Sequence, residues 1–169
     1  MDSSVNEQSL HKCIVFLNEI GIVTIMDESS EDGLLPGLSI QQGRIIIRED
    51  NLQFPGDLLH EAGHIAVVPS SDRSSLHDEL LAGRENREAE EMMAIAWSYA
   101  ACLHLGLPPE FVFHTAGYKG GGEYIIDAFN NGNYFGLPML QWVGMTFDEK
   151  QAKKKKVLPF PHMVRWLRN

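Results

Sequence analysis

The hydrophobic and polar positions near the start of the chain repeat with the period of a helix. Leu10, Ile14, Leu17 and Ile20 are spaced three or four residues apart, and Gly21 follows them. This spacing predicts an amphipathic helix that ends at the glycine. The next run, IVTIMDE, is rich in β-branched residues and predicts a strand.

Two short β-branched runs follow in the segment GLSIQQGRIIIRED. They flank Gln41, Gln42 and Gly43, and a glycine between two such runs is typical of a hairpin turn. We therefore expect a small antiparallel sheet ahead of the next helix.

Helix-breaking residues define two further helices. Pro55 and Asp57 favour a helix start, since the exposed amides of a first turn attract a carboxylate, and Pro69 ends the helix after about three turns. The second helix is predicted from REAEEMMAIAWSYAACLHLGLPP, which stops at Gly106. Because its second half is apolar on nearly every face, we expect it to be central and buried.

The remaining segments are more polar or richer in glycine. SSDRSSLHDELLAGREN allows one short turn, and a short helix is expected at about 123–130 between glycine-rich loops. The end of the chain, PFPHMVRWLRN, predicts a final helical turn that packs through Met163 and Trp166. Together these elements predict an α+β protein.

Length and composition indicate one domain with its own core. The chain has 169 residues, of which 44% are hydrophobic, which suits a single domain over residues 1–169. Within it we expect a core with the functional site at 35–102 and a C-terminal extension at 103–169. Cys13 and Cys102 lie far apart with no Cys-x-x-Cys, so both are expected to be small buried side chains.

The charge narrows the range of partners. A net charge of −9 argues against general binding of nucleic acid or of an anionic membrane, because phosphate binding needs clustered cations. The lysines at 153–156 are expected to form a solvated face. No run approaches the roughly twenty apolar residues of a membrane span, and the start MDSSVNEQSL is too polar for a signal peptide. The sequence therefore predicts a cytoplasmic protein.

The segment PGDLLHEAGHIAVVP carries the candidate chemistry. His60 and His64 are one helical turn apart, so both imidazoles can reach one ion. Glu61 is rotated by about 100° from His60, so its carboxylate misses direct coordination but can meet a water on the metal. Zinc lowers the pKa of such a water to about 7, and the carboxylate can take its proton and later deliver it to a leaving amine. Chance alone produces this motif roughly three times in a hundred such chains, so a third ligand is needed.

Glutamates at the start of the second predicted helix offer that ligand. The metzincin arrangement is excluded, because Val67 and Ser70 stand where it requires a glycine and a histidine. Glu91 is the first choice, since it shares a helical face with small and apolar residues and should point into the protein. A buried carboxylate costs several kcal/mol unless it is paired or on a metal. Glu88 is the second choice and Glu90 the third.

Several other side chains are candidates for the site. His77 and Asp78 lie between the two helices and remain alternatives as the third ligand. The segment FHTAGYKGGGEY offers His114, Tyr118 and Tyr124. We expect His114 or Tyr118 to be catalytic, by stabilising the oxyanion that forms when water attacks a carbonyl.

Three segments, GLSIQQGRIIIRED, PGDLLHEAGHIAV and EMMAIAWSYAA, resemble the zincin-like metallopeptidases of the ImmA/IrrE type. The likeness covers about residues 35–102 and includes a helix that begins Glu-x-x-Ala-x-x-aromatic, here Glu91, Ala94 and Trp97. This resemblance implies a zinc-dependent regulatory protease that acts on transcriptional repressors. We apply only the zinc chemistry to this chain, and not the repressor substrate. Ser98 replaces the usual alanine after the aromatic residue, and no helix-turn-helix segment is evident.

The sequence thus predicts a zincin-like α+β domain, with a small antiparallel sheet packed on the His-Glu-x-x-His helix and a second buried ligand-bearing helix. Zn²⁺ would lie on His60, His64 and Glu91, and Glu61 would be general base and acid in hydrolysis of a peptide or protein substrate. No nucleic acid or membrane partner is expected, and the oligomeric state is open. One alternative is a non-catalytic zinc-binding regulatory protein; the other is an interaction module without metal.

Overall fold

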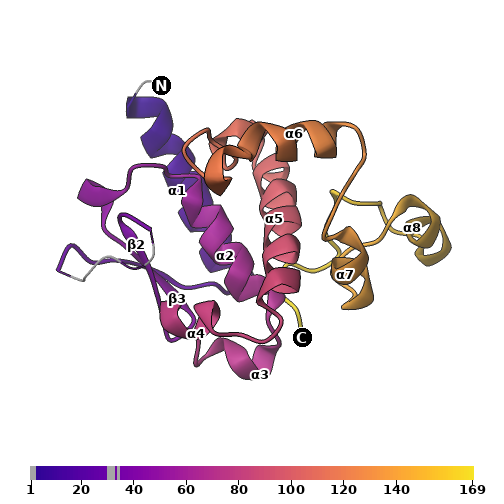
Figure 1. The fold of residues 1–169 in the computed structure, drawn as a ribbon, viewed down its shortest axis with the longest axis horizontal. Coiled ribbons are helices and arrows are strands. Elements are labelled where there is room, and N and C mark those ends of the chain that lie inside the picture. The colour runs from indigo at the N-terminus through magenta and orange to yellow at the C-terminus, as the bar shows by residue number, and fades with distance from the viewer. Residues whose placement is uncertain (1–2, 30–32, 34) are drawn as a thin grey trace.

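The computed structural model describes residues 3–29, 33 and 35–169, which form a set of helices with one small sheet toward one end of the molecule (Figure 1). The α-helices are α1 (Ser3–Ile20), α2 (Asp57–Val67), α3 (Ser70–Arg73), α4 (Asp78–Ala82), α5 (Arg87–His104), α6 (Gly122–Asn130), α7 (Leu137–Trp142) and α8 (Glu149–Lys155). The strands are β1 (Thr24–Met26), β2 (Leu38–Gln41) and β3 (Arg44–Ile47), and the 3-10 helices are η1 (Glu49–Asn51), η2 (Pro109–Phe111) and η3 (Tyr118–Gly120). None of the described helices is both long and apolar enough to cross a membrane.

Most of the predicted elements are confirmed. α1 ends at Ile20, and the chain turns at Gly21, whose φ of +96° suits a residue without a Cβ. β2 and β3 form the predicted hairpin, and Gln42 and Gly43 at its turn both have positive φ (52° and 70°), as in a type I′ turn. The predicted helices after the hairpin correspond to α2, α5 and α6, and the predicted short turn corresponds to α4.

The prediction of a purely antiparallel sheet is wrong. The strand order is β1-β3-β2; β2 and β3 are antiparallel, but β1 pairs with β3 in parallel, with Thr24 opposite Ile45. After β1 the chain crosses over before it forms the hairpin, so β1 lies beside the second hairpin strand rather than the first. A crossover of this kind is what allows two strands of one sheet to run in the same direction.

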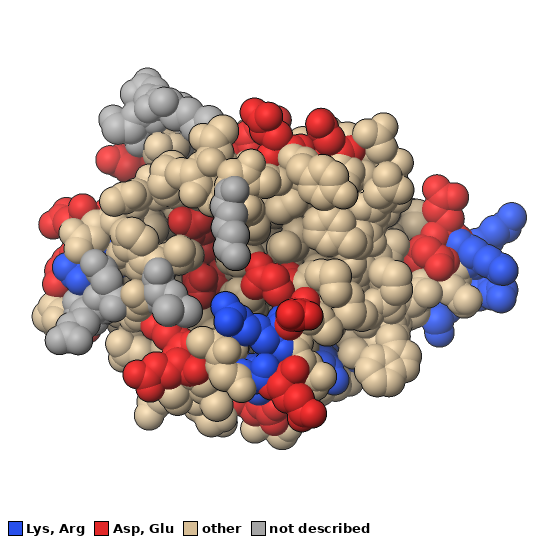
Figure 2. Space-filling model, in the orientation of Figure 1, with Lys and Arg blue, Asp and Glu red and all other residues tan. Residues whose placement is uncertain are grey.

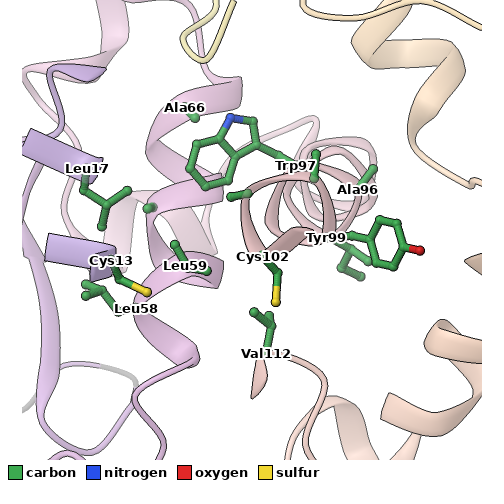
Figure 3. Packing of buried hydrophobic residues seen from close by; sticks show 14 of the residues in the cluster. Cys13, Leu17, Leu58, Leu59, Ala66, Ala96, Trp97, Tyr99, Cys102 and Val112 are labelled. Atoms are coloured by element: carbon green, nitrogen blue, oxygen red, sulfur yellow. The ribbon is translucent and has the colours of Figure 1, made fainter. Parts of the chain in front are cut away.

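Helix α2 lies between α1 and α5 in the centre of the hydrophobic core (Figures 1 and 3). Figure 3 shows Leu58 of α2 near Cys13 of α1, and Ala66 of α2 near Trp97 of α5. These side chains are fully buried. Burial raises the pKa of the thiols of Cys13 and Cys102 to about 12, so both are neutral core side chains, as the sequence predicts.

Helices α2 and α5 approach each other closely at Gly63. A Cβ on this residue would lie 2.9 Å from the carbonyl oxygen of Ala94 and 3.2 Å from its Cα and Cβ. The Ser98 hydroxyl, one turn further along α5, donates a 3.3 Å hydrogen bond to the carbonyl oxygen of Leu59. Small residues therefore allow the two helix backbones to pack against each other without intervening side chains.

The end of the chain packs as predicted but is not helical. Pro159 and Pro161 interrupt the segment, since proline lacks an amide donor and restricts the residue before it. Trp97 Nε1 donates a 2.8 Å hydrogen bond to the carbonyl oxygen of Trp166, and Arg168 N donates to Ala66 O at 2.9 Å. The tail thus binds both α5 and the last turn of α2. Helices α7 and α8 were not predicted.

Replacement of Gly63 by valine should separate the two central helices. The new side chain would collide with the backbone of Ala94, so we expect the free energy of unfolding to fall by about 2–3 kcal/mol in urea titrations. Gly83→Val is the matched control, because a Cβ at Gly83 would meet only carbonyl oxygens of its own turn, at 3.6 Å or more. Equal losses in both variants would contradict a specific role for the contact at Gly63.

Candidate metal centre

Helix α2 places His60 and His64 on one face, one turn apart, as the motif predicts. Their Nε2 atoms are 3.2 Å apart, and the rings meet edge to face with centroids 4.6 Å apart. Both side chains are mostly buried, with 12% and 17% of their surface exposed. The two nitrogens therefore converge on one point at the rim of the core.

Glu91 reaches the same point from the first turns of α5. Its Oε1 lies 3.5 Å from His60 Nε2, and its Oε2 lies 3.4 Å from His64 Nε2. The expectation that this carboxylate is buried is wrong in part, because 39% of the side chain is exposed. The reason is its position near the start of α5, where the helix leaves the core.

Glu61 is the buried carboxyl of the centre. One ligand atom each from His60, Glu61 and His64 lies within 4.8 Å of the others, so this group could hold a metal ion. Burial, together with the negative charges of Asp78, Asp57 and Glu91, raises the pKa of Glu61 to about 8. A nearby cation would relieve this repulsion and favour the ionised form.

The histidines are neutral at physiological pH. Burial lowers the pKa of His60 well below its usual value, and burial lowers the pKa of His64 to about 4. A neutral imidazole keeps a lone pair on one ring nitrogen, which is the form that ligates metals. The centre is therefore prepared for a cation without first having to release protons from these rings.

The other candidates for a third ligand are engaged elsewhere or lie at the surface. Glu90 is buried, but both of its oxygens bind Arg84, at 2.6 and 2.9 Å. Glu88 is exposed. Asp78 Oδ1 accepts a hydrogen bond from Ile40 N at 3.2 Å, and His77 is the exposed N-cap of α4. Of the candidates for a third ligand, Glu91 alone has carboxylate oxygens within 3.5 Å of both imidazole Nε2 atoms among the described residues.

The two candidates for oxyanion stabilisation occupy different places. The Tyr118 ring meets His60 edge to face at 5.2 Å, and its hydroxyl is buried with no hydrogen-bond partner among the described residues. His114 Nε2 instead lies 2.9 Å from Asp57 Oδ1, and its ring stacks on Phe54. Tyr118 therefore lies against one candidate ligand, His60, whereas His114 contacts the first turn of α2.

Two hollows meet at this centre. A small cavity of about 50 Å³ is bordered by Glu61, His64, Glu91 and Arg87. A groove of about 1090 Å³ runs between α5 and α6, and Glu91, Arg87 and Tyr118 belong to its walls. Figure 2 shows basic side chains near the middle of the visible face with acidic side chains around them.

Sequence analysis missed two arginines of the site. Arg84 binds both Glu90 and Asp72, and so fixes the start of α5. Arg87 borders both hollows; burial raises the pKa of Glu91, and the positive charge of Arg87 offsets part of that rise. The two arginines are three residues apart in the sequence, but nothing in that spacing indicated which glutamate each would approach.

No protein-family model matches the chain, and neither the curated proteins nor the solved structures yield a significant match.

The buried carboxyl of Glu61 should make the metal-free protein sensitive to pH. Burial raises the pKa of Glu61 from 4.5 to about 8, so the folded protein holds the proton on this carboxyl more tightly than the unfolded chain does. The stability that the protonated carboxyl contributes is fully present below pH 4.5 and is lost as the pH rises through about 8. In protein treated with a chelator, we expect the free energy of unfolding of Glu61→Gln at pH 9 to be higher than that of wild type by more than about 1 kcal/mol.

This difference should disappear at pH 4, where both side chains are uncharged, and urea titrations at the two pH values measure it. Glu88→Gln removes one exposed carboxyl from α5 and controls for net charge. An equal advantage of Glu61→Gln at both pH values would contradict a titration effect.

Proposed function

We propose that the protein is a zinc-dependent peptidase, with zinc on His60, His64 and Glu91 and with Glu61 as general base and acid. The observation that carries the proposal is the convergence of three donor groups from two helices. The distances between their nearest atoms are 3.2, 3.4 and 3.5 Å. Tetrahedral zinc with ligands at about 2.0–2.1 Å requires donors about 3.3 Å apart. The separation of the two imidazole nitrogens is close to this value, and a different oxygen of Glu91 is nearest to each of them, which supports a zinc site here.

Glu91 suits the third position better than Glu61 does. Its two oxygens face the two Nε2 atoms, whereas Glu61 follows His60 directly and is therefore rotated by about 100° around α2. This leaves Glu61 beside the small cavity of about 50 Å³, which has room for one water molecule. In this arrangement Glu91 is the metal ligand and Glu61 transfers the proton.

Bound zinc would polarise a substrate carbonyl and make a water molecule acidic at neutral pH. Glu61 takes the proton of the attacking water and carries it to the nitrogen of the leaving amine. The burial that raises its pKa suits this task, because a general base works best when its pKa is near the working pH. Ionisation of Glu61 is favoured only while a positive charge lies beside it.

Tyr118 is the group best placed to donate a hydrogen bond to the oxyanion. Its hydroxyl is buried and has no hydrogen-bond partner within the part of the chain that the structure describes, and burial raises its pKa well above the usual value, so it stays protonated. The catalytic role expected for His114 stays a prediction; its contact with Asp57 favours a supporting role.

The groove between α5 and α6 would hold the peptide. It combines polar side chains near Glu91 with apolar side chains further along, among them Ile95, Ile125 and Phe135. A cleft of this kind offers hydrogen bonds near the reacting bond and apolar contact beyond it. We therefore assign the substrate backbone to the segment next to Tyr118 and Glu91.

Protein purified without added zinc should contain about one zinc ion per chain, measured by mass spectrometry of the metals. Glu91→Ala and His64→Ala should lose the ion. Free zinc at a thousandfold excess over Kd stabilises wild type by about 4 kcal/mol, so chelation should lower its free energy of unfolding by that amount. Glu88→Ala should retain it, because Glu88 is exposed.

Retention of zinc in Glu91→Ala would move the third ligand elsewhere. Absence of any metal from wild type, with no binding of added zinc in calorimetry, would contradict the metal centre and favour an interaction module.

Cleavage of an internally quenched peptide library should depend on Glu61 and Tyr118. We expect Glu61→Gln to keep zinc and lower kcat by about 10²–10⁴-fold, since it can accept no proton. Tyr118→Phe should lower kcat by about 10²-fold with little change in KM, because an oxyanion donor acts in the transition state.

Full activity of Glu61→Gln would contradict the mechanism. If zinc-loaded wild type cleaves no member of the library, the centre is that of a zinc-binding regulatory protein without catalysis.

A further inference from the structure

The C-terminal part of the chain differs sharply in charge from the rest. After Trp142 the sequence contains seven Lys and Arg residues but only two Asp and Glu residues, a net charge of +5. The whole chain has a net charge of −9, so the residues up to and including Trp142 have a net charge of −14. In Figure 2 basic side chains gather where Figure 1 places α8, at the end of the molecule opposite the sheet.

The same part of the chain exposes large apolar side chains. Trp142, at the end of α7, is 85% exposed, Leu158 is 63% exposed and Val164 is 43% exposed. Exposed tryptophan is uncommon away from interaction sites, because its ring loses much apolar contact with the protein. Lys153 and Lys156 lie close to these residues in sequence and are also exposed.

A groove of about 720 Å³ brings the two features together. Its walls include Trp142, Phe147, Val164 and two cationic side chains, Lys155 and Arg165. The Lys155 ammonium group lies over the Phe147 ring, 4.8 Å from its centroid. None of the described residues that line the groove is acidic. The groove therefore combines apolar side chains with charged groups that are all positive.

We propose that this groove binds an extended acidic segment of a partner protein, with one apolar side chain of the segment packed on Trp142. Carboxylates on either side of that side chain would pair with Lys155 and Arg165. Aromatic and arginine side chains are the residues that most often dominate binding energy at protein interfaces.

The shape of the surface favours a peptide segment over a membrane. A bilayer is contacted by protruding apolar side chains on one face of a long amphipathic helix, whereas α8 has seven residues and a single buried one, Ala152. A concave groove instead encloses a side chain from several directions. The two acids at the start of this helix, the N-cap Asp148 and Glu149, do not line the groove, and Asp148 Oδ1 accepts a hydrogen bond from Gln151 N.

The inference is independent of the proposed zinc chemistry. The groove is built from α7, α8 and the tail, and shares no residue with the metal centre or with the groove between α5 and α6. It can be tested in wild-type protein whatever its metal content.

The test uses labelled synthetic peptides and fluorescence anisotropy with the full chain. A peptide with one Leu flanked by Glu and Asp should bind, with an affinity that falls several-fold as salt rises. Replacement of its Leu by Gly, or of its acids by Lys, should weaken binding by about tenfold or more.

Variants of the protein locate the binding site. Trp142→Ala should lower the affinity by about tenfold, and Lys155→Glu combined with Arg165→Glu should abolish binding of the acidic peptide. All three side chains lie at the surface of the groove, so the variants should fold, and unchanged far-UV circular dichroism checks this. Lys12→Glu on α1 reverses an exposed charge away from the groove and should bind like wild type.

Three results would overturn the proposal. The first is that none of the acidic peptides binds wild type. The second is that anionic phosphatidylserine vesicles or single-stranded DNA bind through Trp142 while the peptides do not. The third is self-association in analytical ultracentrifugation that Lys155→Glu removes, which would make a second copy of the chain the occupant of the groove.

Discussion

The close packing of α2 against α5 is the contact on which the rest of the site depends. Gly63 leaves no side chain between the helices, so the backbone of α5 lies directly beside the turn of α2 that carries both histidines. A wider separation would move Glu91 away from His60 and His64, since these residues are on different helices. Because helix backbones are stiff, a single glycine determines donor distances that flexible side chains alone would not maintain.

Electrostatics explains why this rim of the core is unlike an ordinary helix interface. Glu61 is buried near the carboxyl groups of Asp78, Asp57 and Glu91, whose negative charges add to burial in raising its pKa, and its histidine neighbours are neutral. Arg84 is paired with Glu90 instead. The protein thus keeps a buried acidic group where a cation fits, and buried groups of this kind are typical of functional sites.

The two ends of the molecule carry different chemistry. One end combines the sheet, α2 and the convergent donors, and the other combines α7, α8, an exposed tryptophan and positive charge. The tail connects them, because Trp166 packs on Phe16 and Trp97 while Arg168 binds the last turn of α2. A proposed catalytic centre and a proposed docking groove therefore belong to one folded unit and yet share no side chains.

Periodic patterns in the sequence were sufficient for the local elements, since helix, strand and turn formation depend on neighbouring residues. The spacing of His60 and His64 places both on one face of any helix, and Gly43 indicates a hairpin wherever that hairpin lies. The parallel pairing of β1, the non-helical tail and helices α7 and α8 were not predictable in this way, because they depend on contacts between distant segments. The same limit applied to the choice of glutamate, because Glu90 and Glu91 are adjacent in sequence. Only the position of Arg84 in the tertiary structure decided that Glu90 pairs with an arginine while Glu91 faces the histidines.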